Sequence, residues 1–343
     1  MERKLASVRM ITDIRPIEGA DAIECAVVDG WTVVVKKDEF QVGSRVVYFE
    51  IDSWIPYEMA PFLSKGKEPR EFNGVKGERL RTVKLRGQLS QGLVIPVPIG
   101  FVDACVGDDL TSTLGIQKWE APLPACLSGQ AEGMFPSSFT KSDQERAQNL
   151  VREIFIDHDD EMYEVTLKLD GSSFSIYNKG DGQVGVCSRN LELKVNEENA
   201  DNSFIRTARE TGLLDVMSRP EYQDFMVQAE LMGPGIQGNR EGLKGFELFV
   251  FDVQKKGHVK LSPGDRAAFF HRLVELGANI KHCPVVQNMV KLIDLRIDGI
   301  DDLKKWADQP SMNNHIAEGF VFKSYDSDFT FKIINDRFLL GEK

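Results

Sequence analysis

A stretch without regular periodicity divides the chain into two parts. Between Val106 and Phe139 the apolar pattern disappears while Gly, Pro and Ser accumulate, as is typical of a connection between domains. The chain has 343 residues, more than the roughly 250–300 at which a single hydrophobic core usually stops growing. We therefore predict two domains, residues 1–105 and 136–343, joined by a linker over residues 106–135.

The N-terminal part has the pattern of a small β-barrel. Residues 22–28 and 31–36 flank Asp29-Gly30, a two-residue turn whose residue types suit left-handed backbone dihedrals. Further β-branched or aromatic runs lie at residues 5–11, 45–51, 79–85 and 93–97. About five or six strands of this kind predict an OB-like barrel.

The C-terminal part mixes strands with two helices. Strand-like runs cover residues 162–168, 174–178, 184–188, 225–231 and 246–253. Ser142 and Glu145 form a capping-box pattern ahead of apolar residues at helical spacing, which predicts a helix over residues 142–156. Ser262-Pro263 starts a second predicted helix that ends at Gly277. Because no βαβ alternation is evident, we predict a mixed, mainly antiparallel α+β domain.

Charge is unevenly distributed along the chain. The formal net charge of −11 argues against a protein that coats nucleic acid non-specifically, since such binding needs a basic surface. Residues 65–87 nevertheless hold eight basic residues against three acidic ones. The sequence thus predicts a local basic surface on the N-terminal domain.

Cysteine usage and hydropathy point to a cytoplasmic protein. Cys25, Cys105, Cys126, Cys187 and Cys283 form no C-x-x-C pair, so we interpret them as buried, reduced thiols. No apolar run approaches the ~20 residues of a membrane span, and the first residues lack a signal-peptide core. We expect no membrane association.

The residues best suited to chemistry follow a predicted strand of the C-terminal domain. Lys168-Leu169-Asp170-Gly171 places a lysine at a strand end beside a glycine that lets the backbone approach a ligand closely. Alone the pattern is weak, because exposed lysines at strand ends are common. Five further segments follow it in order: 188–190 (SRN), 228–233 (QAELMG), 246–252 (FELFVFD), 318–323 (EGFVFK) and 331–335 (FKIIN).

Three carboxylates in this series form a candidate metal site. Asp170, Glu230 and Glu318 are hard oxygen ligands suited to Mg²⁺ or Mn²⁺, which retain several waters when bound. A lysine is a useful nucleophile only after its ammonium loses a proton, and a nearby cation would favour that loss. For any one of these carboxylates alone, a solvated acidic side chain at a strand end is the simpler interpretation.

The ordered series resembles motifs I, Ia, III, IIIa, IV and V of the covalent, ATP-dependent ligases. In the N-terminal domain, residues 17–24 (IEGADAIE), 30–31 (GW) and 85–93 (LRGQLSQGL) resemble the OB domain of the Naegleria- and Deinococcus-type RNA ligases. Residues 141–149 (KSDQERAQN) resemble the segment that leads into their catalytic domain. The resemblance implies a nucleotidyltransferase (ATP-grasp-like ligase) domain after the OB domain, in an ATP-dependent RNA ligase that repairs 5′-phosphate/3′-hydroxyl breaks.

The resemblance also implies a reaction sequence. Lys168 would attack the α-phosphorus of ATP to give lysyl-AMP, the AMP would move to the RNA 5′-phosphate, and the 3′-hydroxyl would displace it. Asp170, Glu230 and Glu318 would hold Mg²⁺ or Mn²⁺ through its water shell. The expected partner is RNA with 5′-phosphate and 3′-hydroxyl ends in a nicked duplex, and we expect the protein to be a monomer.

Four further residues are implied as ligands of the nucleotide or RNA. Lys332 would touch the α-phosphate, and Arg189 would contact the nucleotide or the RNA 5′-phosphate. Phe251 would stack on adenine, although a Phe in an apolar strand is more often core. Arg146 would reach the ATP phosphates, although a surface arginine on a helix is the simpler interpretation. Many relatives carry a second lysine where this chain has Ile334.

Other functions are less consistent with these patterns. Residues 233–238 match G-x-G-x-x-G, but no helix is predicted after them, so we interpret them as a turn and not as a dinucleotide site. DNA ligases and mRNA-capping enzymes share the lysine chemistry, but they usually place the OB domain last. A non-catalytic OB-fold nucleic-acid-binding protein would need the basic segment but not the carboxylates.

Overall fold

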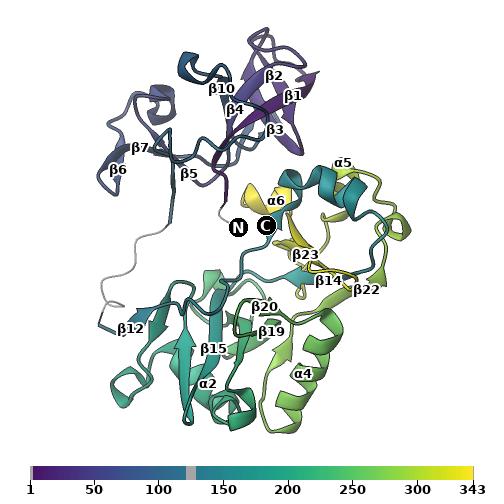
Figure 1. Ribbon diagram of the computed structural model, residues 1–343. Helices are drawn as coiled ribbons and strands as arrows, with labels where there is room; N and C mark the ends of the chain where they lie inside the picture. The colour runs from purple at the N-terminus through teal and green to yellow at the C-terminus, as the bar shows by residue number, and fades with distance from the viewer. Residues whose placement is uncertain (1–2, 121–128, 343) are drawn as a thin grey trace. The chain divides into compact units, whose positions relative to one another are not determined.

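The computed structural model describes residues 3–120 and 129–342, and the chain divides into two compact units, Met1–Pro122 and Leu123–Lys343 (Figure 1). Each unit has its own hydrophobic cores. None of the helices in the described residues is long and apolar enough to cross a membrane.

The first unit is built on a five-stranded antiparallel sheet. Its order is β10-β4-β1-β2-β3, with β1 at Ala6–Pro16, β2 at Ile23–Val28, β3 at Trp31–Lys36, β4 at Arg45–Phe49 and β10 at Leu93–Pro96. Alternation on β4 buries Val47 and Phe49 in one core and Val46 and Tyr48 in another. The predicted turn at Asp29-Gly30 joins β2 to β3, and Asp29 has a φ of 51°.

The basic segment forms the second part of this unit. A four-stranded sheet has the order β11-β5-β7-β6, with β5 at Ser53–Pro56, β6 at Arg70–Phe72, β7 at Val75–Arg79 and β11 at Gln117–Lys118. β8 (Val83–Leu85) and β9 (Gln88–Ser90) form a hairpin. The Thr32 hydroxyl on β3 donates to the Leu89 carbonyl on β9 over 3.2 Å. The short 3₁₀ helices η1 and η2 span Pro61–Ser64 and Ile99–Phe101.

The range predicted as a linker contains strands of both units. β11 pairs with β5, and β12 (Ala131–Met134) pairs with β17 (Leu191–Leu193) of the second unit. Residues 121–128 of that range, including Cys126, lie outside the described residues. Of the other cysteines, Cys25, Cys187 and Cys283 are buried, whereas Cys105 is exposed, so the prediction of burial is wrong for Cys105.

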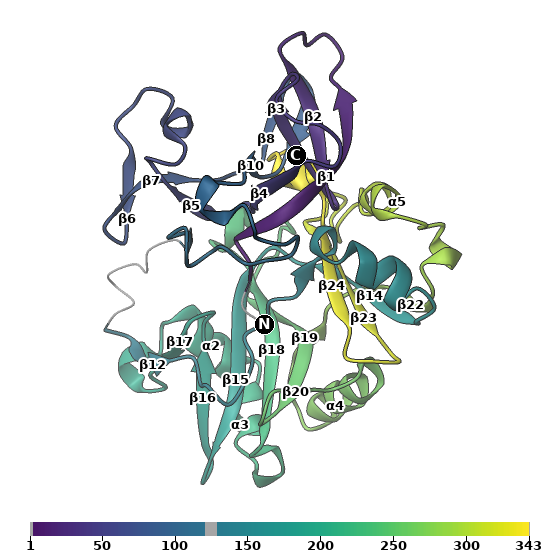
Figure 2. The ribbon, with the colours of Figure 1, turned by 45° about the horizontal axis from the view of Figure 1, so that its top comes forward.

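The second unit contains two sheets. The larger has the order β12-β17-β16-β15-β18-β19-β20, and β21 pairs with β19. Figure 2 shows β15, β18 and β19 side by side, as their antiparallel registers require. The remaining strands are β15 at Ser172–Gly180, β16 at Gln183–Cys187, β18 at Phe225–Met232, β19 at Glu247–Lys255, β20 at Val259–Lys260 and β21 at Lys281–His282.

The smaller sheet has the order β13-β24-β23-β14-β22. Its strands are β13 at Glu145–Arg146, β14 at Tyr163–Lys168, β22 at Val285–Val290, β23 at Gly319–Ser324 and β24 at Thr330–Ile334. Among the described pairs of this unit, β13 with β24 and β19 with β21 are parallel, and the others are antiparallel. The predicted mixed, mainly antiparallel α+β domain is therefore confirmed.

Helices cover the larger sheet and flank the smaller one. Side chains of α2 (Ser203–Glu210), α3 (Leu213–Met217) and α4 (Pro263–Glu275) share a core with β15, β16, β18 and β19. α5 (Ile300–Trp306) contributes to the core of the smaller sheet, and α6 (Asp336–Leu339) follows β24. The unit also contains short helical segments: the 3₁₀ helices η3 at Ala147–Asn149, η5 at Glu197–Asn199, η6 at Pro220–Tyr222 and η7 at Gln237–Asn239, and the π-helix η4 at Glu153–Asp157. A sixth, η8, spans Ile293–Leu295.

One helix prediction is confirmed, and the other holds only for its second half. α4 begins as predicted, because the Ser262 hydroxyl accepts a hydrogen bond from the Asp265 backbone N–H. Of the helix predicted over residues 142–156, the first five residues are not helical, whereas 147–149 form η3 and 151–157 form a short helical stretch that ends in η4. Glu145 and Arg146 pair with β24 as a strand, and the Glu145 carboxylate accepts hydrogen bonds from the Arg146 N–H and the Asn149 amide. Pairing with a distant strand thus overrides the local capping pattern.

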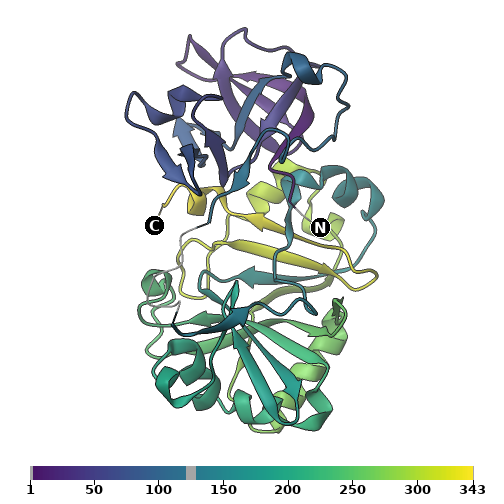
Figure 3. The same ribbon diagram turned by 60° about the vertical axis from the view of Figure 1, so that its left-hand side comes forward.

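The chain crosses between the two sheets at the candidate site. β14 ends at Lys168 in the smaller sheet, and β15 begins at Ser172 in the larger one (Figure 3). A shared core joins the two sheets, with Leu167 and Phe322 from one and Met232 and Phe249 from the other. The two sheets therefore hold the intervening Leu169-Asp170-Gly171 turn between them.

Candidate active site

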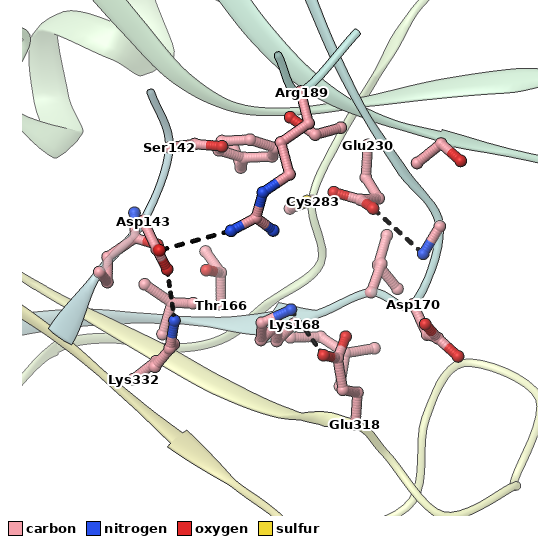
Figure 4. Close-up of a pocket in the computed structure, with 18 of the residues that line it drawn as sticks. Ser142, Asp143, Thr166, Lys168, Asp170, Arg189, Glu230, Cys283, Glu318 and Lys332 are labelled. Carbon is pink, nitrogen blue, oxygen red and sulfur yellow. Dashed lines mark hydrogen bonds and ion pairs between the residues drawn. The ribbon is translucent and has the colours of Figure 1, made fainter. Parts of the chain in front are cut away.

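A cavity of about 530 Å³ lies between the two sheets of the second unit (Figure 4). Most of the residues singled out from the sequence line it: Lys168, Asp170, Arg189, Glu230, Phe251, Glu318 and Lys332. Arg146 is not among the lining residues. The fold thus brings together side chains that are up to 164 positions apart in the chain.

Lys168 forms an ion pair with Glu318 at the centre of the cavity. The Lys168 Nζ donates to Glu318 Oε1 over 2.7 Å, and the Lys168 side chain is 28% exposed. The pair forms because Lys168 on β14 lies opposite Gly319, the residue after Glu318. Burial lowers the pKa of Lys168, but the carboxylates of Glu318, Glu230 and Asp170 outweigh it and hold that pKa above its ordinary value.

Gly319 lets β23 come close enough to β24 for this arrangement. Its φ is 158°, and a Cβ at this position would lie 2.1 Å from the Ile333 carbonyl oxygen. Since no side chain fits there, glycine is required directly after Glu318. The E-G pair at residues 318–319 therefore has a steric reason in this fold.

Glu230 is held by the backbone of the turn after Lys168. The Gly171 N–H donates to Glu230 Oε1 over 3.1 Å. A Cβ on Gly171 would lie 2.6 Å from the Leu231 carbonyl oxygen and 2.8 Å from Glu230 Cγ, so only glycine permits this approach. Burial, together with the negative charges of Glu318 and Asp170, raises the pKa of Glu230 to about 8.

The three carboxylates repel one another in a partly dry site. Burial and the Glu318 charge raise the pKa of Asp170 to about 6. The second carboxylate oxygen of Glu318 is buried and makes no hydrogen bond within the described residues. A bound cation would offset the surplus negative charge and would give the buried Glu318 oxygen a partner.

The carboxylates do not form a compact direct-ligand cluster. Within residues 3–120 and 129–342, no three His, Cys, Asp or Glu side chains lie close enough to ligate one ion together. The arrangement therefore fits a hydrated Mg²⁺ or Mn²⁺, since Mg²⁺ usually keeps several waters and meets a protein through one or two carboxylates.

Two cations on opposite sheets share one carboxylate. Lys332 on β24 donates to Asp143 Oδ1 over 2.7 Å, and Arg189 donates to Asp143 Oδ2 over 3.4 Å. Burial lowers the pKa of Lys332 to about 8, helped by repulsion from Lys168 and Arg146 and opposed by Asp143. Asp143 was not singled out from the sequence, although it lies inside the resembling segment 141–149.

Phe251 lines the cavity, whereas Phe249 does not. Phe249 is 3% exposed and lies in the shared core. The β18–β19 register shifts here, because Gln228 pairs with Asp252 while Ala229 pairs with Val250. This β-bulge leaves Phe251 without a ladder partner, and such bulges re-aim side chains next to functional sites.

Arg146 differs from its interpretation as a surface arginine on a helix. It is 8% exposed and lies on β13, where its backbone pairs in parallel with Lys332. Its charge contributes to lowering the pKa of Lys332, although its side chain does not line the cavity.

Lys323 and Asp252 form a buried ion pair beside the cavity. The Lys323 Nζ lies 2.6 Å from Asp252 Oδ1, and both residues are less than 5% exposed. The neighbouring cations, Lys323 foremost, overcome burial and lower the pKa of Asp252 to about 2. Lys323 lines the cavity, so the pair supports its wall.

The G-x-G-x-x-G match at residues 233–238 is a turn, as predicted. Gly233, Gly235 and Gly238 all have positive φ, and the short η7 at Gln237–Asn239 overlaps the end of the motif. No α-helix begins there to receive a pyrophosphate.

Comparisons with known proteins agree with the fold. An OB-fold domain family matches residues 5–97, and the RNA ligase family matches residues 161–334. No curated protein matches the chain. The chain belongs to the RNA ligase family, and its fold is an OB-fold domain followed by an RNA ligase domain.

Solved structures of Naegleria gruberi RNA ligase are similar over the full length. The structure with PPi is 42% identical, covers 98% of each chain and has a TM-score of 0.87. The structure of a mutant with ATP and Mn is 40% identical, covers 99% of each chain and has a TM-score of 0.87. The structure of a second mutant with AMP and Mn has the same identity and coverage and a TM-score of 0.88. These findings confirm the family resemblance found in the sequence, and the protein is an RNA ligase.

Proposed function

We propose that this RNA ligase uses ATP to join 5′-phosphate and 3′-hydroxyl RNA ends through lysyl-AMP and adenylylated RNA, in RNA repair. The observation that carries the proposal is the position of Lys168, whose Nζ lies 2.7 Å from Glu318 in a cavity lined by further cations. Naegleria gruberi RNA ligase, with which this chain shares about 40% of its residues, has been solved with ATP and with AMP.

Lys168 is the proposed nucleophile. Its neutral amine attacks the α-phosphorus of ATP, a P–N bond forms, and the bond to the pyrophosphate leaving group breaks. The amine must first lose the proton that the Glu318 carboxylate stabilises. The AMP then passes to the RNA 5′-phosphate, and the 3′-hydroxyl displaces it to form the phosphodiester.

Three other residues are proposed to hold the nucleotide. Lys332 contacts the α-phosphate, where the developing charge needs a positive partner. Arg189 contacts the nucleotide or the RNA 5′-phosphate from the opposite sheet. Phe251 stacks on adenine, in keeping with the bulge that turns it towards the cavity. Arg146, which lies outside the lining, is proposed to act through its charge on Lys332.

Asp170, Glu230 and Glu318 are proposed to hold Mn²⁺ or Mg²⁺ through its water shell. Mn is present in the Naegleria gruberi structures with ATP and AMP. When bound, such an ion supplies positive charge that screens the phosphates and disfavours the ammonium form of a nearby lysine. The raised pKa values of Asp170 and Glu230 are consistent with carboxylates arranged for a cation.

The N-terminal OB-fold domain is proposed to bind the RNA. Its basic segment at residues 65–87 includes Arg81, Lys84 and Arg86, whose side chains are exposed on or near the β8–β9 hairpin. Exposed cations suit the phosphate backbone of a nicked duplex. We also expect a cytoplasmic monomer.

A sealing assay tests the proposal. The full-length protein is incubated with ATP and Mn²⁺ or Mg²⁺ on four nicked duplexes that carry RNA or DNA strands and either 5′-phosphate/3′-hydroxyl or 5′-hydroxyl/3′-phosphate ends. We expect sealing of RNA with 5′-phosphate and 3′-hydroxyl ends only in the presence of ATP. Sealing of the opposite end chemistry would contradict the proposed reaction, and a preference for all-DNA nicks would indicate a DNA ligase.

A further inference from the structure

Asp143 lines the cavity and contacts one cation from each sheet. Its Oδ1 accepts from Lys332 on β24 of the smaller sheet over 2.7 Å, and its Oδ2 accepts from Arg189, between β16 and β17 of the larger sheet, over 3.4 Å (Figure 4). The carboxylate thus lies where the cations proposed to hold the phosphates converge.

The segment that carries Asp143 is held in place by buried side chains. The Thr140 N–H donates to Gln254 Oε1 over 2.9 Å, and the Thr140 carbonyl accepts from Gln254 Nε2 over 2.7 Å. Gln228 donates to the same carbonyl over 3.1 Å, and both glutamines are at most 1% exposed. Lys141 also donates to Asn190, the neighbour of Arg189, over 2.8 Å. The segment that places Asp143 in the cavity is therefore fixed by hydrogen bonds to buried side chains.

The Asp143 carboxylate offsets the repulsion between positively charged side chains in a partly buried cavity. The Lys332 side chain is 15% exposed, and Lys168 and Arg146 repel its charge. A carboxylate beside Lys332 offsets this cost. A nucleotide phosphate offers the same chemistry, since both groups present anionic oxygens to N–H donors at about 2.7–2.9 Å. Two anions at one pair of cations repel each other, so the carboxylate and the phosphate compete.

We propose that the Asp143 carboxylate takes the place of the nucleotide phosphate. It pairs with Lys332 and Arg189 when no nucleotide is bound, and the phosphate displaces it from them on binding. The inference rests on the proposed function, because that function assigns the phosphate to Lys332. Exchange has a consequence for specificity. A weakly charged anion cannot displace the carboxylate, whereas a nucleotide phosphate that also gains contacts to its base can.

Binding of AMP and adenosine to the full-length protein tests the exchange. AMP carries the phosphate but no pyrophosphate leaving group, so it binds without forming lysyl-AMP. Calorimetry would compare wild type, Asp143→Asn and Asp143→Ala with Asp159→Asn, which removes one exposed negative charge outside the cavity lining. We expect both Asp143 variants to bind AMP about threefold to tenfold more tightly than wild type. Adenosine affinity should stay unchanged in all proteins, which also reports that the cavity is folded.

The possible outcomes separate the exchange from the proposed function. Weaker or unchanged AMP binding in the Asp143 variants would overturn the exchange, because it would mean that Asp143 orients the cations or has no effect on them. Equal affinity of the wild-type protein for AMP and adenosine would overturn the phosphate site itself and the exchange with it. An equal gain in Asp159→Asn would mean that overall charge, and not the contact with Lys332, causes the effect.

Discussion

The Lys168 ammonium and the Glu318 carboxylate lie 2.7 Å apart at the ends of paired strands, and each is surrounded by further negative charge. In this arrangement the pKa of the lysine is held above its ordinary value, which favours the ammonium form. A lysine that is to act as a nucleophile must lose that proton. The carboxylates are therefore expected to serve the reaction by holding a cation, and not by keeping the lysine protonated.

Neutralising the carboxylates should suppress the first chemical step. We expect Asp170→Asn, Glu230→Gln and Glu318→Gln each to lower the rate of lysyl-AMP formation by about 100-fold or more, because the lost charge can no longer hold the cation. The measurement is transfer of label from α-labelled ATP to the protein across a Mn²⁺ titration. Asp159→Asn, outside the cavity lining, should behave like wild type. Wild-type rates in all three variants would contradict the metal site.

Gly171→Ala should damage both stability and chemistry. The added Cβ would lie 2.6 Å from the Leu231 carbonyl oxygen and 2.8 Å from Glu230 Cγ, so the turn after Lys168 must shift. Overpacking of this kind costs about 1–3 kcal/mol of unfolding free energy. Urea unfolding and the labelling assay would measure the two effects. Gly264→Ala, where a Cβ meets open space in α4, is the matched control and should leave both near wild type.

Asp252→Asn should destabilise the wall of the cavity. It leaves the Lys323 ammonium buried without its carboxylate partner, which costs about 3–5 kcal/mol of unfolding free energy. The pKa of Asp252 is about 2 in the folded protein against an ordinary 3.8, so its contribution is fully present above 3.8 and is lost as the pH falls towards 2. The difference in unfolding free energy between wild type and variant should therefore shrink over that pH window.

A double variant separates this effect from the loss of packing. Replacing both partners, as in Asp252→Leu with Lys323→Met, removes the buried charges together and should cost less than Asp252→Asn alone. A larger loss in the double variant, or a difference that stays constant between pH 4 and pH 2, would mean that the ion pair does not account for the stability of the wall.

Removing basic side chains on or near the β8–β9 hairpin of the OB-fold domain should lower the rate of RNA sealing more than the rate of lysyl-AMP formation. Arg81 and Lys84 are exposed and lie outside the cavity lining, so Arg81→Ala with Lys84→Ala should leave lysyl-AMP formation near wild type. Loss of two phosphate contacts should weaken RNA binding and reduce its salt slope by about two. Lys36→Ala with Lys37→Ala, two exposed lysines at the end of β3, is the control. An unchanged salt dependence of nicked-RNA binding would contradict a role for the hairpin.

Much of this architecture follows from local sequence. The turn at Asp29-Gly30 and the start of α4 at Ser262 depend on neighbouring residues, so their residue types predict them correctly. The glycines after Asp170 and Glu318 also stand out in the sequence, although their steric reason is the close approach of the Leu231 and Ile333 carbonyl oxygens from other strands.

The misses arise where distant segments decide the structure. Glu145 and Arg146 become a strand because they pair with residues 331 and 332, far along the chain. Phe251, which the sequence analysis named, does line the cavity, but the β-bulge that leaves it unpaired is set by pairing with β18 and is not evident in the sequence. Asp143 gains its importance only from contacts with Arg189 and Lys332, which no periodicity in the sequence reveals.

Covalent labelling at Lys168 tests the central claim most directly. The full-length protein and Lys168→Ala are incubated with α-labelled ATP and Mn²⁺, separated on a denaturing gel and digested to find the labelled peptide. We expect label on the wild-type peptide that contains Lys168, released by acid as a P–N bond requires, and no label on the variant. Lys168→Ala should still seal RNA that is already adenylylated, which shows that it is folded. Labelled AMP on the Lys168→Ala protein, or on another peptide of the wild type, would contradict the account.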